Sequence, residues 1–127
     1  MSKKIVTSSD APQAIGPYSQ AVEAGGFVFV SGQIPLDPKT GSVIQGDIKA
    51  QTKLVLDNAK AVLTAAGCTM SSVVRSTIYL KNMNDFAAVN EVYGSYFPAA
   101  PPARATVEVS RLPKDVSVEV DLIAWKG

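Results

Sequence analysis

The chain contains no histidine and only one cysteine among its 127 residues. Without histidine it lacks the commonest general base, the commonest zinc ligand and any Ser-His-Asp triad. The single cysteine, Cys68, cannot form a disulfide within the chain or a cysteine-based metal cluster, which agrees with a reducing compartment. Any catalysis must therefore use carboxylates, tyrosine, lysine, arginine, backbone groups and water.

Charged residues and long apolar runs are also scarce. Only 18% of the residues are charged and the formal net charge is +1, so the composition gives no support for binding to nucleic acid. No run of about 18 apolar residues is present, so we expect no membrane span. The polar N-terminal stretch lacks the apolar segment of a secretory signal. We therefore expect a cytoplasmic protein folded as a single domain, residues 1–127.

Hydrophobic periodicity and turn residues predict two helices and six strands. The predicted strands cover residues 3–6, 22–24, 27–34, 73–80, 104–110 and 116–125. The first helix lies between an N-cap at Asp47 and a C-terminal Gly67, and the second runs from Asn84 to about Tyr96. This order indicates an α+β fold of two layers, with both helices on one face of the sheet. The other face would stay half-apolar, which suggests an oligomer.

The last two predicted strands carry the most informative charges. If they pair as a hairpin about Arg111 and Leu112, then Arg104 lies opposite Glu119 on the polar face. The simplest interpretation is a surface ion pair, worth about 0–1 kcal/mol. The alternative is that the guanidinium fork of Arg104 binds the carboxylate of a small molecule.

Two further segments each allow a structural and a functional interpretation. Residues 15–20 (IGPYSQ) form a rigid Gly-Pro turn, which either packs Tyr18 on the core or presents its ring to a ligand. Residues 30–35 (VSGQIP) place Gly32 within a strand. A glycine at such a position marks either a β-bulge or a site where a ligand or chain approaches the backbone closely.

Taken together, these segments resemble the Rid family, also called the YjgF or reactive intermediate/imine deaminase family. The matching stretches are AIGPYSQ (14–20), SGQIP (31–35), DFAAVNEVY (85–93) and PARATVEVSRLPKD (102–115). The resemblance runs essentially from end to end and is most similar to the RidA-like subgroup. It implies a chorismate-mutase-like two-layer subunit with a mixed β-sheet. It also implies a homotrimer with a central β-barrel and active sites between subunits.

The resemblance further implies an enzyme that acts in metabolite damage control. Its expected activity is that of a 2-iminobutanoate/2-iminopropanoate deaminase, a hydrolase that converts 2-aminoacrylate-type enamines and imines to 2-oxo acids and ammonia. Pyridoxal-phosphate-dependent dehydratases release these intermediates, and the deaminase itself is expected to need no cofactor or metal. Two alternatives remain open: a non-catalytic regulatory protein that binds 2-oxo acids, and an endoribonuclease or translation inhibitor.

Family roles can be transferred to individual positions of this chain. By resemblance, Arg104 binds the substrate carboxylate and Glu119 orients the attacking water. Tyr18 corresponds to a tyrosine that a neighbouring subunit supplies to the cleft. Both catalytic roles therefore fall in the segment that the hairpin prediction singles out.

Four further positions correspond to residues that line the family's pocket. Ser31 and Gly32 match one wall, and Asn90 matches a recurrent asparagine nearby. Thr106 stands where many members carry cysteine, so this chain offers no reactive thiol there. The exchange leaves the preferred imine side chain open.

Overall fold

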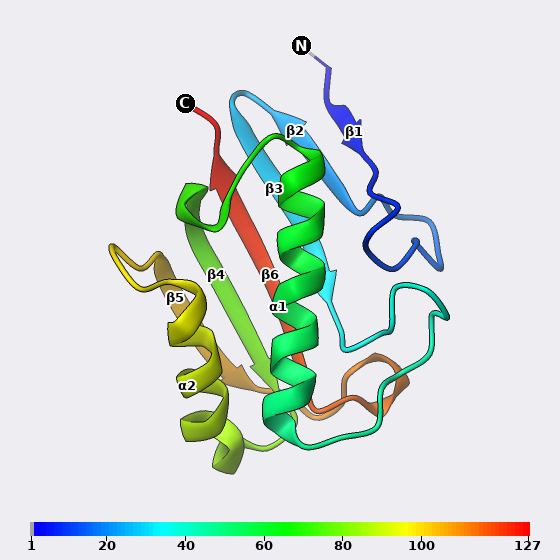
Figure 1. Ribbon diagram of the computed structural model, residues 1–127, viewed down its shortest axis with the longest axis vertical. Coiled ribbons are helices and arrows are strands. Elements are labelled where there is room, and N and C mark those ends of the chain that lie inside the picture. The colour runs from blue at the N-terminus through cyan, green and yellow to red at the C-terminus, as the bar shows by residue number, and fades with distance from the viewer. Residues whose placement is uncertain (1) are drawn as a thin grey trace.

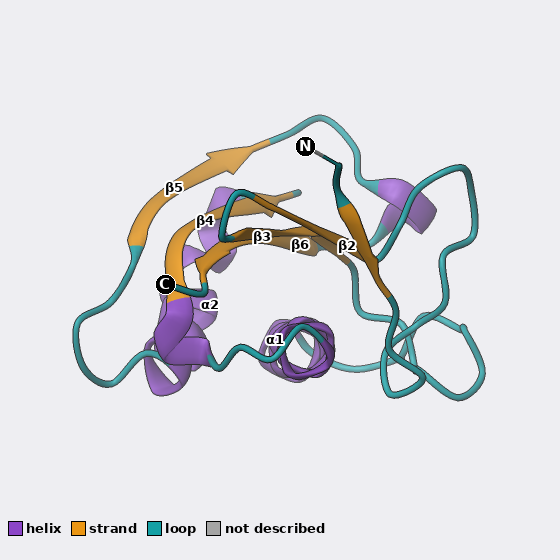
Figure 2. Cartoon of the chain, turned by 90° about the horizontal axis from the view of Figure 1, so that it is seen from above, coloured by secondary structure: helices purple, strands orange, loops and turns teal. Residues whose placement is uncertain are grey.

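The computed structural model describes residues 2–127 and has two layers, a twisted six-stranded sheet and two helices that cover one of its faces (Figures 1 and 2). The strands are β1 (Lys4–Val6), β2 (Ala21–Ala24), β3 (Phe27–Gln33), β4 (Val73–Leu80), β5 (Ala103–Glu108) and β6 (Val118–Trp125). The helices are α1 (Ile48–Ala65) and α2 (Phe86–Tyr96), and 3₁₀ turns occupy Met70–Ser72, Met83–Asp85 and Pro113–Asp115. The predicted α+β class, with both helices on one face, is confirmed.

The strand order is β1-β2-β3-β6-β4-β5, in which only β4 and β5 are parallel. The predicted hairpin between the last two strands is therefore wrong, because β4 lies between β5 and β6. Helix α2 is the crossover that parallel strands require. The chain then passes the end of β4, where Val109 N donates to Leu80 O (2.9 Å) and Lys81 N donates to Ser117 O (3.1 Å). It enters the gap beside β3 as the central strand β6.

Helix α1 forms where its caps and its apolar face predict it. The Asp47 carboxylate accepts a hydrogen bond from Ala50 N (2.9 Å), and Gly67 takes the left-handed backbone conformation (φ 80°) just beyond the helix. The predicted apolar face is buried against the sheet: Val55, Ala59, Val62, Leu63 and Ala66. On β6 the alternate residues Val118, Val120 and Leu122 bury against this face.

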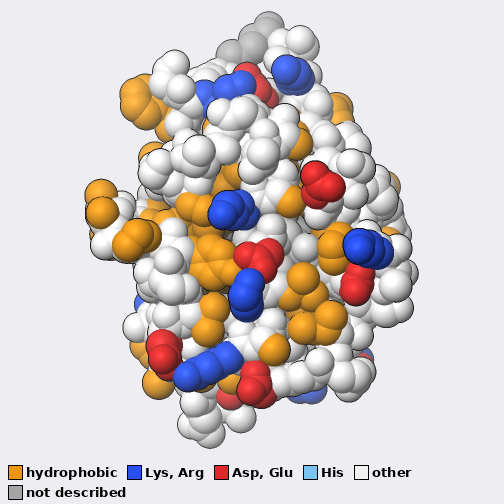
Figure 3. Space-filling view, viewed as in Figure 1, with side chains coloured by type: hydrophobic (Ala, Val, Ile, Leu, Met, Phe, Trp, Pro, Cys, Tyr) orange, Lys and Arg blue, Asp and Glu red, His pale blue; other side chains and the backbone are white. Residues whose placement is uncertain are grey.

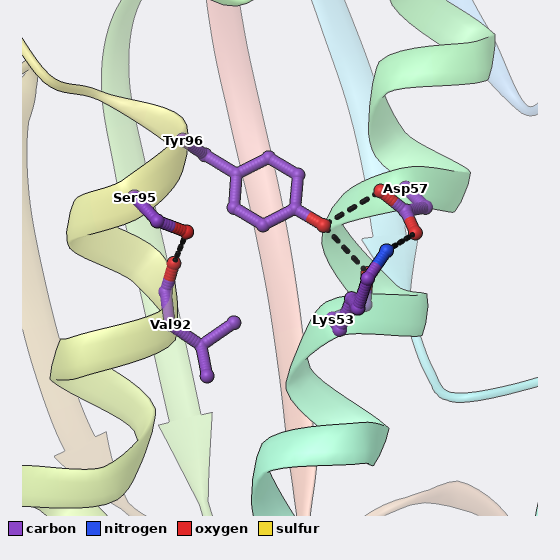
Figure 4. Close-up of polar contacts among 5 residues, drawn as sticks. All are labelled: Lys53, Asp57, Val92, Ser95 and Tyr96. Carbon is purple, nitrogen blue, oxygen red and sulfur yellow. Dashed lines mark hydrogen bonds and ion pairs between the residues drawn. The ribbon is translucent and has the colours of Figure 1, made fainter.

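Helix α2 begins two residues later than predicted, because residues 83–85 form a 3₁₀ turn in which Asn82 Oδ1 accepts from Asn84 N (2.9 Å). Its end is joined to α1 by polar contacts (Figure 4). The Tyr96 hydroxyl donates to Asp57 Oδ1 (2.6 Å) and lies 3.2 Å from the Lys53 carbonyl. Burial and the Asp57 carboxylate raise the pKa of Tyr96 well above its ordinary value. The hydroxyl therefore remains a donor and fixes α2 over β4 and β5.

No helix of the described chain covers the other face of the sheet (Figure 2). This face carries large apolar side chains. Phe27 and Phe29 of β3 pair in register with Trp125 and Ile123 of β6. Phe27, Phe29, Trp125 and Val107 of β5 are each between 40% and 54% exposed. This is the half-apolar face that the two-layer prediction left without a covering element.

Candidate functional site

The guanidinium of Arg104 lies on the helix side of β5 and is held by one face of α2. Its Nη1 donates to Asn90 Oδ1 (2.7 Å), and its carbon Cζ lies 4.9 Å from the ring centroid of Tyr93 and 5.6 Å from that of Phe86. Phe86, Asn90 and Tyr93 follow one another at helical spacing, so a single helix face presents all three. Aromatic rings attract a cation over their faces. Arg104 is thus oriented before any ligand arrives.

Tyr93, one of the two rings beside Arg104, is itself held in place by a hydrogen bond to the sheet. The Tyr93 hydroxyl lies 2.5 Å from Ser76 Oγ, and Ser76 is the residue directly opposite Arg104 on β4. Both side chains are buried, and burial raises the pKa of Tyr93, which keeps its hydroxyl neutral. Within residues 2–127 the guanidinium makes no hydrogen bond other than that to Asn90. Its remaining N–H donors are therefore free for a carboxylate.

Thr106 lies two residues after Arg104 on the same face of β5. Its Oγ1 is buried and, within residues 2–127, has no hydrogen-bond partner. A buried hydroxyl without a partner costs about 1–3 kcal/mol of stability. The hydroxyl thus lowers the stability of the chain at a position that the family resemblance assigns to the pocket.

Replacing Thr106 by valine, which keeps the shape and removes the hydroxyl, is expected to raise the free energy of unfolding by about 1 kcal/mol. Urea denaturation of the parent protein and Thr106→Val measures the change. Thr106→Ser is the control, since it retains the hydroxyl and loses the methyl group, and it is expected to be less stable than the parent. A valine variant less stable than the parent would mean that the assembled protein supplies the hydroxyl with a partner.

The side chain of Glu119 lies in a separate cavity of about 330 Å³ at the end of β3. The cavity gathers three other residues predicted for the site, Tyr18, Ser31 and Gly32. Its other lining residues are Pro12, Gln13, Ile15, Gln20, Gln33, Ile34, Leu36 and Pro113. Strand β6, strand β3, the loop of residues 7–20 and the turn at Pro113 therefore build this cavity together.

Gly32 lies at the β-bulge that the structural interpretation of its position predicts. The β3–β6 register shifts between Val30 and Gln33, so a β-bulge is present. A Cβ atom added to Gly32 would overlap the Glu119 carboxylate and lie 2.9 Å from its Cδ. The group that approaches the backbone is thus a side chain of the same chain, and glycine is needed there for space.

The loop that carries Tyr18 is tied to β3 by hydrogen bonds. Ser31 Oγ donates to Ser19 O (2.6 Å), and the buried Gln20 side chain bonds to Ser8 N (2.6 Å) and to Pro12 O (2.8 Å). The Tyr18 side chain does not pack into the core, because the residue is 50% exposed. The Gly-Pro turn therefore presents the ring at the surface beside the cavity.

The surroundings of Glu119 disfavour its charged form. Burial, and then the charge of Asp121, raise the pKa of the Glu119 carboxyl above its ordinary value. A carboxyl group with a raised pKa in the folded state binds protons more tightly there than in the unfolded chain. Stability should thus fall as the pH rises from the unfolded pKa to the folded one, and then stay constant.

Replacing Glu119 by glutamine removes this ionisation and is expected to raise the melting temperature at neutral pH. Below about pH 4, where both states of the parent are protonated, the difference between the two proteins should shrink. Thermal melts of both proteins across this pH range measure it. A stability difference that does not vary with pH would contradict the raised pKa of Glu119.

The structure separates the predicted site residues into two groups. Asn90, Arg104 and Thr106 form one group on the helix side of β5. Tyr18, Ser31, Gly32 and Glu119 form the other around the cavity. Glu119 alternates with the buried residues of β6 and therefore projects from the helix-free face. Within one chain, Arg104 and Glu119 lie on opposite faces with β4 between their strands.

The pattern of the sequence did not predict that two aromatic rings of α2 lie beside Arg104. Phe86 is 39% exposed, Tyr93 is buried, and both rings lie beside the guanidinium. Their spacing relative to Asn90 was the available signal. It places all three residues on one helix face, which the pattern alone could not connect with Arg104.

Another cavity, a groove of about 980 Å³, lies between α1 and α2. Apolar and charged side chains are interspersed over this helix face (Figure 3). None of the predicted site residues lines the groove. Within residues 2–127 no three His, Cys, Asp or Glu side chains group as a metal site requires, and no helix is long and apolar enough to cross a membrane.

Comparison with known proteins finds relatives that match nearly the whole chain. The model of the family described as Endoribonuclease L-PSP matches residues 8–126. A RutC family protein of Pyrococcus horikoshii is 57% identical over 124 residues, and a 2-iminobutanoate/2-iminopropanoate deaminase of Salmonella typhimurium is 50% identical over 127 residues. Each alignment covers 98% of both chains. The solved structure of E. coli TdcF with bound serine superposes with a TM-score of 0.93 at 45% identity, covering 98% of this chain and 99% of TdcF.

Proposed function

Because the chain belongs to the Rid, or YjgF, family, we propose that it is an imine deaminase that hydrolyses 2-aminoacrylate-type intermediates to 2-oxo acids and ammonia. The observation that carries the proposal is the preoriented guanidinium of Arg104, with N–H donors left over for a carboxylate. The relatives support it, since proteins 50% identical to this chain are named 2-iminobutanoate/2-iminopropanoate deaminase. TdcF binds serine, a small molecule of related size and charge.

The active site in this proposal forms between copies of the chain. One chain cannot bring Arg104 and Glu119 to one ligand, because they project from opposite faces of the sheet. In a closed ring of copies, the Arg104 group of one subunit can meet the Glu119 cavity of the next. The uncovered apolar face, which includes the exposed Phe29 and the partly buried Ile123 opposite it, supplies surface for such an assembly. We propose the homotrimer with a central barrel that the family resemblance implies.

In the proposed reaction Arg104 binds the carboxylate of the imine through paired hydrogen bonds. Glu119 of the adjoining subunit orients a water molecule and takes its proton as the oxygen bonds to the imine carbon. The C=N π electrons move to nitrogen, which takes up a proton. A second proton from solvent then converts the amino group of the carbinolamine to an ammonium leaving group. The hydroxyl proton passes to solvent as the C–N bond breaks, which releases ammonia and the 2-oxo acid. Tyr18 and Ser31 shape the wall beside the reacting carbon.

A coupled assay tests the proposal directly. A dehydratase generates 2-aminoacrylate from serine, and the release of pyruvate is followed with and without this protein. We expect pyruvate release to be faster than the spontaneous hydrolysis of the intermediate. An unchanged rate, also with imines derived from leucine and from aromatic amino acids, would contradict the proposed activity.

Two other functions remain separable by experiment. A regulatory protein would bind 2-oxo acids in a calorimeter without accelerating pyruvate release. An endoribonuclease, the activity in the family description, would degrade RNA after repurification and lose that activity in Arg104→Ala. The chain has no histidine and no basic stripe, so no feature of it favours RNA cleavage.

A further inference from the structure

A second carboxylate stands next to Glu119. Asp121 follows it by two residues on β6, so both side chains project from the helix-free face with their Cα atoms about 7 Å apart. Both residues are half-buried. Within residues 2–127, no Lys or Arg nitrogen lies within 4 Å of either carboxylate. The proposed mechanism gives Asp121 no role, although it shares the face of the base.

A tyrosine on the neighbouring strand holds Asp121 in place. Tyr79 lies directly opposite Glu119 in the β4–β6 ladder, and its hydroxyl donates to Asp121 Oδ2 (3.0 Å). Burial, the hydrogen bond and the charge of Asp121 all raise the pKa of Tyr79. The hydroxyl therefore keeps its proton, and the contact keeps the carboxylate of Asp121 at a fixed position beside Glu119.

Few other charges can influence Glu119 from the elements packed around it. The titratable and charged groups on these elements are Tyr79 and Arg75 of β4, Asp10 and Tyr18 of the loop, and Lys114 and Asp115 beside Pro113. Strand β3 contributes Ser31, Gly32 and Gln33 to the cavity wall, and none of these residues is charged. Among the charged groups of residues 2–127, Asp121 alone contributes to the raised pKa of Glu119.

We propose that Asp121, held by Tyr79, is a positioning residue that makes Glu119 a stronger base for the proton of the attacking water. The inference rests on the proposed function, in which Glu119 takes that proton. Two carboxylates on one partly desolvated face repel each other, and a proton on one of them relieves the repulsion. A base whose proton affinity suits neutral pH transfers protons more effectively in the transition state.

The first test measures Glu119 itself by carboxyl ¹³C NMR titration of the parent protein and of Asp121→Asn. Asparagine keeps the size of the side chain and can still accept from Tyr79, but it lacks the charge. The titration midpoint of Glu119 is expected to fall by about half to one pH unit. Asp57→Asn is the matched control, because Asp57 also accepts from a tyrosine hydroxyl (Tyr96, 2.6 Å) but lies on α1. An unmoved midpoint in Asp121→Asn would overturn the inference.

The second test measures the effect of Asp121 on Glu119 through the kinetics of imine hydrolysis. The acid limb of the pH profile of kcat/KM is expected to shift to lower pH by the same amount in Asp121→Asn. At neutral pH kcat should fall about two- to fivefold with little change in KM. Asp121→Glu should restore the profile, and Tyr79→Phe should shift it part of the way. A variant that is merely less stable, with an unmoved profile, would assign Asp121 a structural role only.

The two tests distinguish the inference from the function on which it rests. A shifted Glu119 midpoint without turnover of any imine would overturn the proposed function and, with it, the role of Asp121 in the reaction. Turnover with an unmoved midpoint would leave the deaminase standing and overturn the inference alone.

Discussion

An equal mixture of Arg104→Ala and Glu119→Gln chains, refolded together, is expected to recover about a quarter of the parent activity. At each interface the chance that one subunit retains Arg104 is one half, and the chance that the next retains Glu119 is also one half. Each variant alone should lose at least about 100-fold in kcat/KM, since several hydrogen bonds to a charged group are removed, or the base is lost. Recovery requires that the two groups come from different copies. Pyruvate release from the mixture measures it.

The controls for this mixture are available in the same chain. Arg111→Ala removes an exposed arginine whose partner is Asp115 (3.0 Å), and it should retain parent activity. A mixture of Arg104→Ala with an Arg104→Ala,Glu119→Gln double variant should stay inactive, because no chain in it carries Arg104. If the Arg104→Ala and Glu119→Gln mixture also stays inactive after verified chain exchange, the site is not shared between copies.

Gly32→Ala is expected to lower kcat/KM by at least about tenfold, because small displacements of a catalytic group cost large factors in rate. The added methyl group would overlap the Glu119 carboxylate and push it from the bulge of β3. Overpacking of this kind should also lower the free energy of unfolding by about 1–3 kcal/mol. Kinetics and urea denaturation of the variant give both numbers.

Gly94→Ala is the matched control for this substitution. Gly94 lies within α2, and a Cβ atom there would meet nothing within 4 Å. Alanine should raise the stability of the helix by about 0.5–1 kcal/mol and leave turnover unchanged. If Gly32→Ala matched Gly94→Ala in stability and turnover, the close approach of Glu119 to Gly32 would not matter for activity.

The sequence predicted the elements of this fold well, because their signals are local. The N-cap at Asp47, the left-handed Gly67 and the alternation along residues 118–122 each depend on neighbours only a few residues away. The two-glycine turn at residues 25–26 likewise has positive φ at both positions and joins β2 to β3. Propensity and periodicity determine features of this kind.

The order of the strands depends on contacts that the sequence pattern does not encode. Consecutive strands pair often enough that a hairpin between β5 and β6 was the natural prediction. Helix α2, which separates β4 from β5, was the contrary signal, since a strand-helix-strand unit is typical of parallel pairing. Once β5 pairs with β4, Arg104 and Glu119 cannot be neighbours in one sheet.

The candidate site shows the same division between local and distant information. Family resemblance named Arg104, Glu119 and the residues of the Gly-Pro loop, but it could not show which of them one chain holds together. The structure divides them, and it adds Phe86, Tyr93 and the Tyr79–Asp121 contact, which depend on packing between elements. The residue pattern of a single helix or strand does not predict such contacts with other elements.

The central position of β6 also constrains the order in which the molecule can fold. β6 follows every other strand in the chain, yet it fills the gap between β3 and β4. During synthesis the β1–β3 meander and the β4–α2–β5 unit therefore cannot be joined into one sheet until β6 has been made. Until then each unit has an exposed strand edge. Joining them pairs residues as far apart as Phe27 and Trp125, and contacts of such long sequence separation slow folding. Chaperone dependence of this chain should therefore be greatest before residues 118–125 have left the ribosome.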